Sequence, residues 1–109
     1  MRQYYLQHIG IKPWVLREAK VDKQNLMDLA FKVSTCVRCP LYETRKQTVF
    51  ARGNPNARLM IIGEAPGFYE DQQGLPFVGK AGALLNKMLH SIDLSEEDVY
   101  IANVLKCRP

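Results

Sequence analysis

Several features that would assign a compartment or a chemistry at once are missing from this sequence. No apolar run approaches the ~20 residues of a membrane-spanning helix, and the N-terminus lacks the apolar core of a signal peptide. We therefore expect a cytoplasmic protein with no membrane partner. Neither of the common glycine patterns that bind nucleotide phosphates is present. The two histidines, His8 and His90, are isolated, so no Ser-His-Asp arrangement can be argued.

The composition fits one small globular domain. The chain has 109 residues, 47% of them hydrophobic, and a net charge of +4. This length accommodates at most one domain, and the hydrophobic content argues against disorder. A mildly basic chain is compatible with nucleic-acid binding, but the charge alone is not evidence for it.

The chain has only three cysteines, which argues against a disulfide framework in a reducing compartment. Cys36 and Cys39 form a chelating Cys-x-x-Cys pair, and Cys107 follows much later. Three thiolates indicate a four-cysteine site with one ligand missing, for either zinc or an iron–sulfur cluster. Inert thiols and a redox dithiol stay open, although a redox pair usually lies at a strand-to-helix turn.

The N-terminal fifth of the chain differs from the rest. Residues 1–21 show no clear periodicity, and Pro13 interrupts any helix there, so we interpret them as an N-terminal arm. The domain portion then covers residues 22–109. Its first helix is predicted to begin at the cap Asp22 and to end near Thr35. Apolar residues recur along it at helical spacing: Leu26, Leu29, Ala30 and Val33.

Two predicted strands flank a second helix in the remainder of the chain. Residues 58–63 and 99–105 are apolar runs typical of buried parallel strands, and residues 81–92 have the period of a helix. Three lesser elements are predicted around them: a short strand at 48–51, a long loop at 63–79 and a capping-box turn at 95–98.

This strand–loop–helix–strand order is one βαβ unit, which indicates an α/β fold with a parallel sheet. A single helix does not cover both faces of such a sheet, although parallel sheets need cover on both. We therefore expect the fold to be incomplete in this chain, which would be either a fragment or a subunit that a partner completes.

The segment 63–82 has the most unusual composition, with five glycines and two prolines directly after an apolar run. Ligands of open α/β sheets bind beyond the carboxyl ends of the strands. The segment leaves the first strand at that end, and Asn103 lies near the same end of the second. We therefore predict one ligand pocket there, which Gly63 and Gly67 allow the backbone to approach closely.

Two side chains suit recognition of a flat, polar ring in this pocket. Phe77 can stack on such a ring, and the amide of Asn103 can donate and accept at once, which suits the imide edge of a pyrimidine. The alternatives are that Phe77 belongs to the core and that Asn103 caps a strand end. The stretch 79–82 either meets a DNA phosphate at a helix start or simply initiates the helix.

At these residues the sequence resembles the iron–sulfur (family 4) uracil-DNA glycosylases, from about residue 30 to the end. The resemblance implies a three-layer α/β fold with a parallel sheet, of which this chain holds the N-terminal portion. Three segments carry it in the right order: Cys36-Val37-Arg38-Cys39-Pro40-Leu41, the glycine-rich stretch from Gly63 to Leu85, and Asn103-Val104-Leu105-Lys106-Cys107-Arg108-Pro109.

The resemblance implies excision of uracil from single- or double-stranded DNA by hydrolysis of the N-glycosidic bond after base flipping. Phe77 would stack on the uracil, Asn103 would pair with its O4 and N3 edge, and Glu70 would press against C5 to refuse thymine. Glu64 would act near the glycosidic bond. The backbone there would line the pocket, through Gly63, Ala65, Pro66 and Gly67.

The resemblance also implies what this chain lacks. Better-known uracil glycosylases carry an aspartate where this chain has Ala65, so preorganised electrostatics would dominate catalysis. Cys36, Cys39 and Cys107 would be three of four ligands of a structural [4Fe–4S] cluster, with zinc as a possible substitute. The fourth cysteine and a His-Pro-Ser/Ala segment lie beyond Pro109 in the family, so the chain alone is expected to be inactive.

A non-enzymatic alternative rests on the arm. Residues 3–14 weakly resemble the N-terminal segment of the psi subunit of bacterial DNA polymerase III, which docks on the chi subunit. This implies a replication or clamp-loader partner for residues 1–21. On that hypothesis the chain is a uracil-glycosylase-like binding module or a replisome-associated scaffold.

Overall fold

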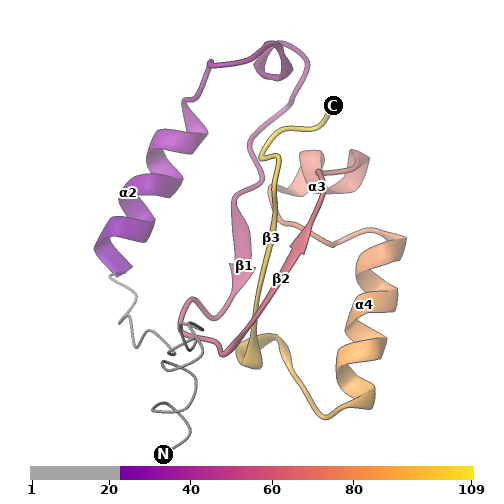
Figure 1. Cartoon of the computed structure of the whole chain (residues 1–109). Helices are drawn as coiled ribbons and strands as arrows, with labels where there is room; N and C mark the ends of the chain where they lie inside the picture. Colours follow the sequence, from indigo (N-terminus) through magenta and orange to yellow (C-terminus); the bar gives the residue numbers. More distant parts are fainter. Residues whose placement is uncertain (1–22) are drawn as a thin grey trace, which may run out of the picture.

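The computed structural model describes residues 23–109 (Figure 1). The predicted arm 1–21 and the cap predicted at Asp22 lie outside the described residues, so docking through the arm stays a prediction. The described elements are α2 (Lys23–Ser34), η1 (Pro40–Tyr42), β1 (Ala51–Gly53), β2 (Leu59–Gly63), α3 (Phe68–Gln73), α4 (Lys80–Ser91), η2 (Glu96–Asp98) and β3 (Val99–Asn103).

The three strands form one sheet in the order β1-β3-β2. β2 and β3 are parallel, as predicted, with Leu59 opposite Val99 and Gly63 opposite Asn103. The α/β class is confirmed. The short strand predicted at 48–51 corresponds to β1, which begins a few residues later. β1 runs antiparallel to β3, so the described sheet is mixed rather than purely parallel.

The described core lies between the sheet and α4. Val99 and Ile101 of β3 are fully buried and form a cluster with Leu89 of α4. Phe77 and Leu85 pack against this cluster. Figure 1 shows α2 on the opposite side of the sheet from α4, which gives the described part of the chain a helix–sheet–helix arrangement.

The two long helices are confirmed to within about one residue, and so is the capping-box turn. In that turn, Asp98 accepts hydrogen bonds from the backbone N–H and the hydroxyl of Ser95. The prediction of an uninterrupted loop at 63–79 is wrong, because it contains α3. Gly67 caps the start of this helix, and Gly74 ends it in the left-handed conformation. Six residues are too few to give a recognisable helical period.

β2 is not the buried strand that its apolar run predicts. It lies at an edge of the described sheet, and Met60 and Ile62 are 53% and 60% exposed. Both point away from the face that α4 covers, because side chains alternate along a strand. Among residues 23–109, nothing covers this second face of β2. Among the same residues, no helix is long and apolar enough to cross a membrane.

A buried carboxylate joins α3 to the segment before the sheet. Both carboxylate oxygens of Asp71 accept the backbone N–H of Lys46, at 2.9 and 3.2 Å. The side chain of Lys46 also donates to Gln72, at 2.6 Å. These bonds hold α3 in place from outside the sheet.

We predict that Asp71→Ala lowers the free energy of unfolding by about 2 kcal/mol, because it leaves a charge-assisted hydrogen bond unmade. Urea denaturation followed by circular dichroism measures this. The exposed carboxylate of Glu97 supplies the control, since Glu97→Ala is expected to stay within about 0.5 kcal/mol of the parent. Equal effects of the two substitutions would contradict the anchoring role of Asp71.

Candidate functional site

The parallel register of β2 and β3 builds the floor of the candidate site. It places Gly63 directly opposite Asn103 at the carboxyl ends of both strands. The two segments stay together beyond the sheet, because the N–H groups of Val104 and Leu105 donate to the carbonyls of Gly63 and Glu64, each at 2.9 Å. Asn103 is buried at this edge.

Phe77 meets Asn103 above Gly63. A side chain at Gly63 would collide with the Asn103 amide oxygen and would come within 2.7 Å of the Phe77 ring. Only glycine therefore allows both side chains to lie against this point of the backbone. Phe77 also packs against the core cluster, as the alternative of a core position predicts, and its stacking role stays a prediction.

These residues line a pocket of about 490 Å³. It receives side chains from the end of β3, from α3 and from the start of α4. The lining residues are Glu64, Ala65, Gly67, Phe68, Tyr69, Glu70, Phe77, Gly79, Lys80, Ala81 and Asn103.

Six of the eight predicted pocket residues therefore line one cavity. The other two do not line it: Gly63 lies against the Phe77 ring, and Pro66 is buried in the segment before α3. The structure thus brings the predicted residues together.

The Glu70 carboxylate ties the two helix starts at the pocket together. One of its oxygens accepts the N–H of Gly67 at 3.1 Å, and the other accepts the N–H of Gly79 at 3.2 Å. Gly67 precedes α3 and Gly79 precedes α4. A carboxylate at these positions also matches the positive end of each helix dipole. The observed role of Glu70 is thus to fix the pocket wall.

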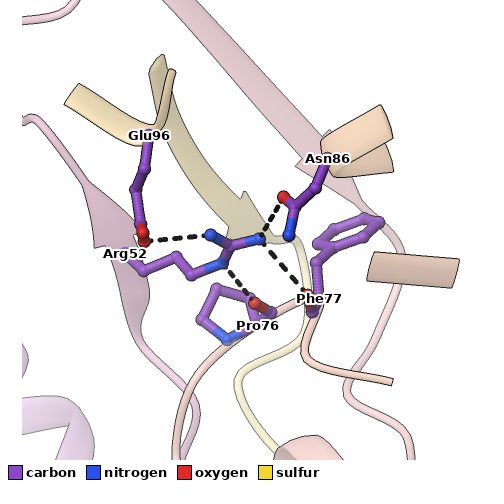
Figure 2. A network of polar contacts seen from close by, with 5 residues as sticks. All are labelled: Arg52, Pro76, Phe77, Asn86 and Glu96. Carbon is purple, nitrogen blue, oxygen red and sulfur yellow. Dashed lines mark hydrogen bonds and ion pairs between the residues drawn. The ribbon is translucent and has the colours of Figure 1, made fainter. Parts of the chain in front are cut away.

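A second network holds the backbone that carries Phe77 (Figure 2). The guanidinium group of Arg52, on β1, donates to the carbonyls of Pro76 and Phe77 at 2.7 and 3.2 Å. It also contacts Asn86 on α4 at 3.2 Å and Glu96 at 2.9 Å. Phe77 has a φ of 56°, a left-handed conformation that costs about 1–3 kcal/mol in a residue other than glycine.

Several groups outside the pocket have displaced pKa values. Burial raises the pKa of Tyr100 and lowers the pKa of Lys106, whose ammonium donates to the Phe50 carbonyl at 3.0 Å. Hydrogen bonds from Ser95 lower the pKa of Asp98. Tyr100 belongs to β3, Asp98 to the turn before it and Lys106 to the segment after it, and none of the three lines the pocket.

The sequence profile of the uracil DNA glycosylase superfamily matches residues 50–109, which include every residue of this pocket. The chain belongs to the uracil DNA glycosylase superfamily. Its relatives include proteins named type-4 uracil-DNA glycosylase. The one from Archaeoglobus fulgidus is 50% identical over 86 residues, and the one from Thermotoga maritima is 44% identical over 88 residues.

The matched regions cover 79% and 80% of this chain, but only 43% and 46% of these two relatives. A third relative, from Saccharolobus solfataricus, is 50% identical over 78% of this chain and 40% of its own length. The chain thus spans less than half the length of the curated relatives it matches.

The three cysteines lie in two segments: Cys36 and Cys39 follow α2, and Cys107 follows β3. Cys107 is buried, Cys36 is half-buried and Cys39 is exposed. Arg45 lies between these segments, with one nitrogen 3.1 Å from the Cys107 sulfur and the other 3.5 Å from the Ser34 carbonyl. Within residues 23–109, no three His, Cys, Asp or Glu side chains are close enough to hold one metal ion. Thiolate donors suit iron–sulfur or zinc chemically, but this arrangement does not gather them.

Sequence reasoning missed several residues of the site. Phe68 and Tyr69 line the pocket because α3, which was not predicted, points them there; their rings meet edge to face at 5.5 Å. Arg52 was missed because its contacts lie 24 to 44 residues away in sequence. Arg52 lies opposite Ile101 on the face of the sheet that α4 covers. A charged residue on a covered face needs partners for its charge, and this is the feature that could have drawn attention to Arg52.

We predict that Gly63→Ala lowers the free energy of unfolding by about 1–3 kcal/mol, because the added methyl group must displace the Phe77 ring and the Asn103 amide. Urea denaturation measures the loss. Gly79→Ala is the matched control, since a methyl group there meets its nearest atom at 3.4 Å. A Gly63→Ala protein as stable as Gly79→Ala would contradict the close approach at this point.

Proposed function

We propose that the pocket binds a uracil flipped out of DNA and that the protein excises it by hydrolysing the N-glycosidic bond. The observation that carries the proposal is the meeting of an aromatic ring, Phe77, and a buried amide, Asn103, over Gly63. The names of the relatives support excision over the alternative of a binding module or replisome-associated scaffold.

In this proposal the two side chains read the base together. Phe77 stacks on the uracil ring, which provides affinity. The Asn103 amide donates to O4 and accepts from N3–H, and this pattern matches the pairing edge of uracil. Because cytosine presents a donor and an acceptor in the opposite places, the same amide orientation rejects it. The burial of Asn103 supports this selectivity, since a mispaired amide in a dry site is costly.

The neighbouring residues complete the pocket. Glu70 stays where its bonds to Gly67 and Gly79 hold it, and its side chain presses against C5 and refuses the methyl group of thymine. Glu64, directly after β2, lies on the side of the glycosidic bond. Lys80, at the start of α4, lines the pocket and attracts the DNA phosphate.

In the reaction, the C1′–N1 bond breaks, uracil leaves with the bonding electron pair, and water adds to C1′. Uracil then acquires a proton at N1. Ala65 supplies no base where better-known uracil glycosylases carry an aspartate. Fixed dipoles that stabilise the oxocarbenium-like sugar and the uracil anion therefore provide most of the rate acceleration.

We predict that Asn103→Ala lowers kcat/KM for uracil release about a hundredfold or more, and that Phe77→Ala lowers it roughly tenfold to a hundredfold. Release of uracil from a single-stranded oligonucleotide measures both values. The assay uses the full-length protein that the gene encodes.

Matched controls remove the same groups from exposed positions on α2. Asn25→Ala and Phe31→Ala are expected to keep the parent activity, because both residues lie on α2, outside the pocket. Activity that survives both pocket substitutions would place the reaction elsewhere. A protein that binds uracil-containing DNA without releasing uracil would favour the binding-module alternative.

We also propose that Cys36, Cys39 and Cys107 are ligands of a [4Fe–4S] cluster, with zinc as the alternative metal. Support comes from the chemistry of three thiolates and from Arg45, which contacts both the Cys107 sulfur and the end of α2 that precedes Cys36. When bound, such a cluster supplies a structural brace between these segments rather than a redox step. The absence of a disulfide among these three cysteines also supports a reducing, cytoplasmic location.

The expected result is that the protein purified without oxygen is brown and contains iron, and that Cys107→Ser lowers its iron content severalfold. Metal analysis and the visible absorption spectrum measure this. Thr35→Ser, next to Cys36, is the control and keeps the iron. A colourless protein that contains zinc would show that zinc is the bound metal instead of the cluster. A metal-free protein would exclude both.

A further inference from the structure

We propose that Arg52 is a positioning residue for Phe77, which it holds at the angle required to stack on the base. This inference deepens the proposed function and rests on it for the role of Phe77. Arg52 lies outside the pocket, on β1, and reaches the site through the backbone on which Phe77 is mounted (Figure 2).

The sheet directs the Arg52 side chain to this backbone. Arg52 pairs with Ile101 across β1 and β3, so both side chains point to the face covered by α4. The Arg52 side chain is only 10% exposed there. A buried cation is costly unless its donors are used, and here all three guanidinium nitrogens make hydrogen bonds.

The two carbonyl contacts are the ones that matter for Phe77. Arg52 donates to successive carbonyls, those of Pro76 and Phe77, and the rigid fork of a guanidinium group is suited to that geometry. The ion pair with Glu96 is different, because Glu96 is 59% exposed and exposed pairs contribute little. The hydrogen bond to Asn86 ties the same guanidinium to α4.

Phe77 needs such a holder because its backbone is in an unfavourable conformation. Its φ of 56° is left-handed, so the free loop would favour other angles. The Phe77 carbonyl, which accepts from Arg52, also packs against Gly82 of α4. A side chain at Gly82 would collide with this carbonyl. The Phe77 carbonyl is thus held between Arg52 and Gly82, and the direction of the ring follows from it.

The consequence is a defined test of coupling. Arg52→Gln removes the fork and lets Phe77 rotate. We expect kcat/KM for uracil release to fall roughly tenfold to a hundredfold, as misplacement of a positioned group does. In a Phe77→Ala background the same substitution should change kcat/KM by less than about twofold, because the residue that Arg52 positions is gone.

A second readout does not depend on activity. The chain has four phenylalanines, and incorporation of 4-fluorophenylalanine gives each a ¹⁹F resonance; Phe77→Leu identifies the Phe77 signal. Arg52→Gln should shift or broaden this signal and leave that of Phe31, on α2, unchanged. Arg52→Lys, which keeps the charge without the fork, serves as a second variant if Arg52→Gln does not fold.

Glu96→Gln is the matched control, because it removes the exposed ion pair and leaves both carbonyl contacts in place. It should leave kcat/KM and the Phe77 signal unchanged. An equal loss from Arg52→Gln with and without Phe77 would overturn the inference, as would an unmoved Phe77 signal. If the parent protein releases no uracil, the proposed function fails, and the ¹⁹F signal alone decides whether Arg52 positions Phe77.

Discussion

The site depends on one constraint, the parallel pairing of β2 with β3 in the register that sets Gly63 opposite Asn103. A shift of one residue would turn Asn103 to the other face of the sheet, because side chains alternate along a strand. The pairing continues past the strands through the N–H groups of Val104 and Leu105. The amide that we assign to base recognition is therefore placed by backbone hydrogen bonds rather than by a flexible loop.

The opposite wall of the pocket is held by single charged side chains. Asp71 fixes α3 to the backbone at Lys46, Glu70 joins the starts of α3 and α4, and Arg52 fixes the carbonyls at Pro76 and Phe77. The two carboxylates accept hydrogen bonds from main-chain N–H groups, and the guanidinium group donates hydrogen bonds to main-chain carbonyls. Such bonds are stronger than those between neutral groups, so a few residues can order a glycine-rich segment.

The sequence predicts those parts of the site that follow from local patterns. The apolar run 58–63 and Asn103 near the end of the next strand indicate one edge of a sheet, and the register confirms that they meet. Local patterns do not reveal α3, which is capped by two glycines and spans only six residues. They also do not reveal Arg52, because it acts through carbonyls that the chain brings near only after folding.

The exposed face of β2 is a different kind of discrepancy. Its residues have the composition of a buried strand, yet Met60 and Ile62 are open in the described part of the chain. The run is consistent with a strand whose second face is meant to be covered. The relatives that this chain matches are more than twice as long as the matched region.

The absence of an aspartate at Ala65 makes this positioning more important. A general base can also act through one bridging water molecule. Stabilisation by fixed dipoles has no such intermediate, and its strength depends on groups that are already in place before charge develops. In the proposed reaction, the rate would then depend on how rigidly Phe77 and Asn103 hold the base. That rigidity comes from Arg52, Gly82 and the β2–β3 register, none of which belongs to the pocket lining.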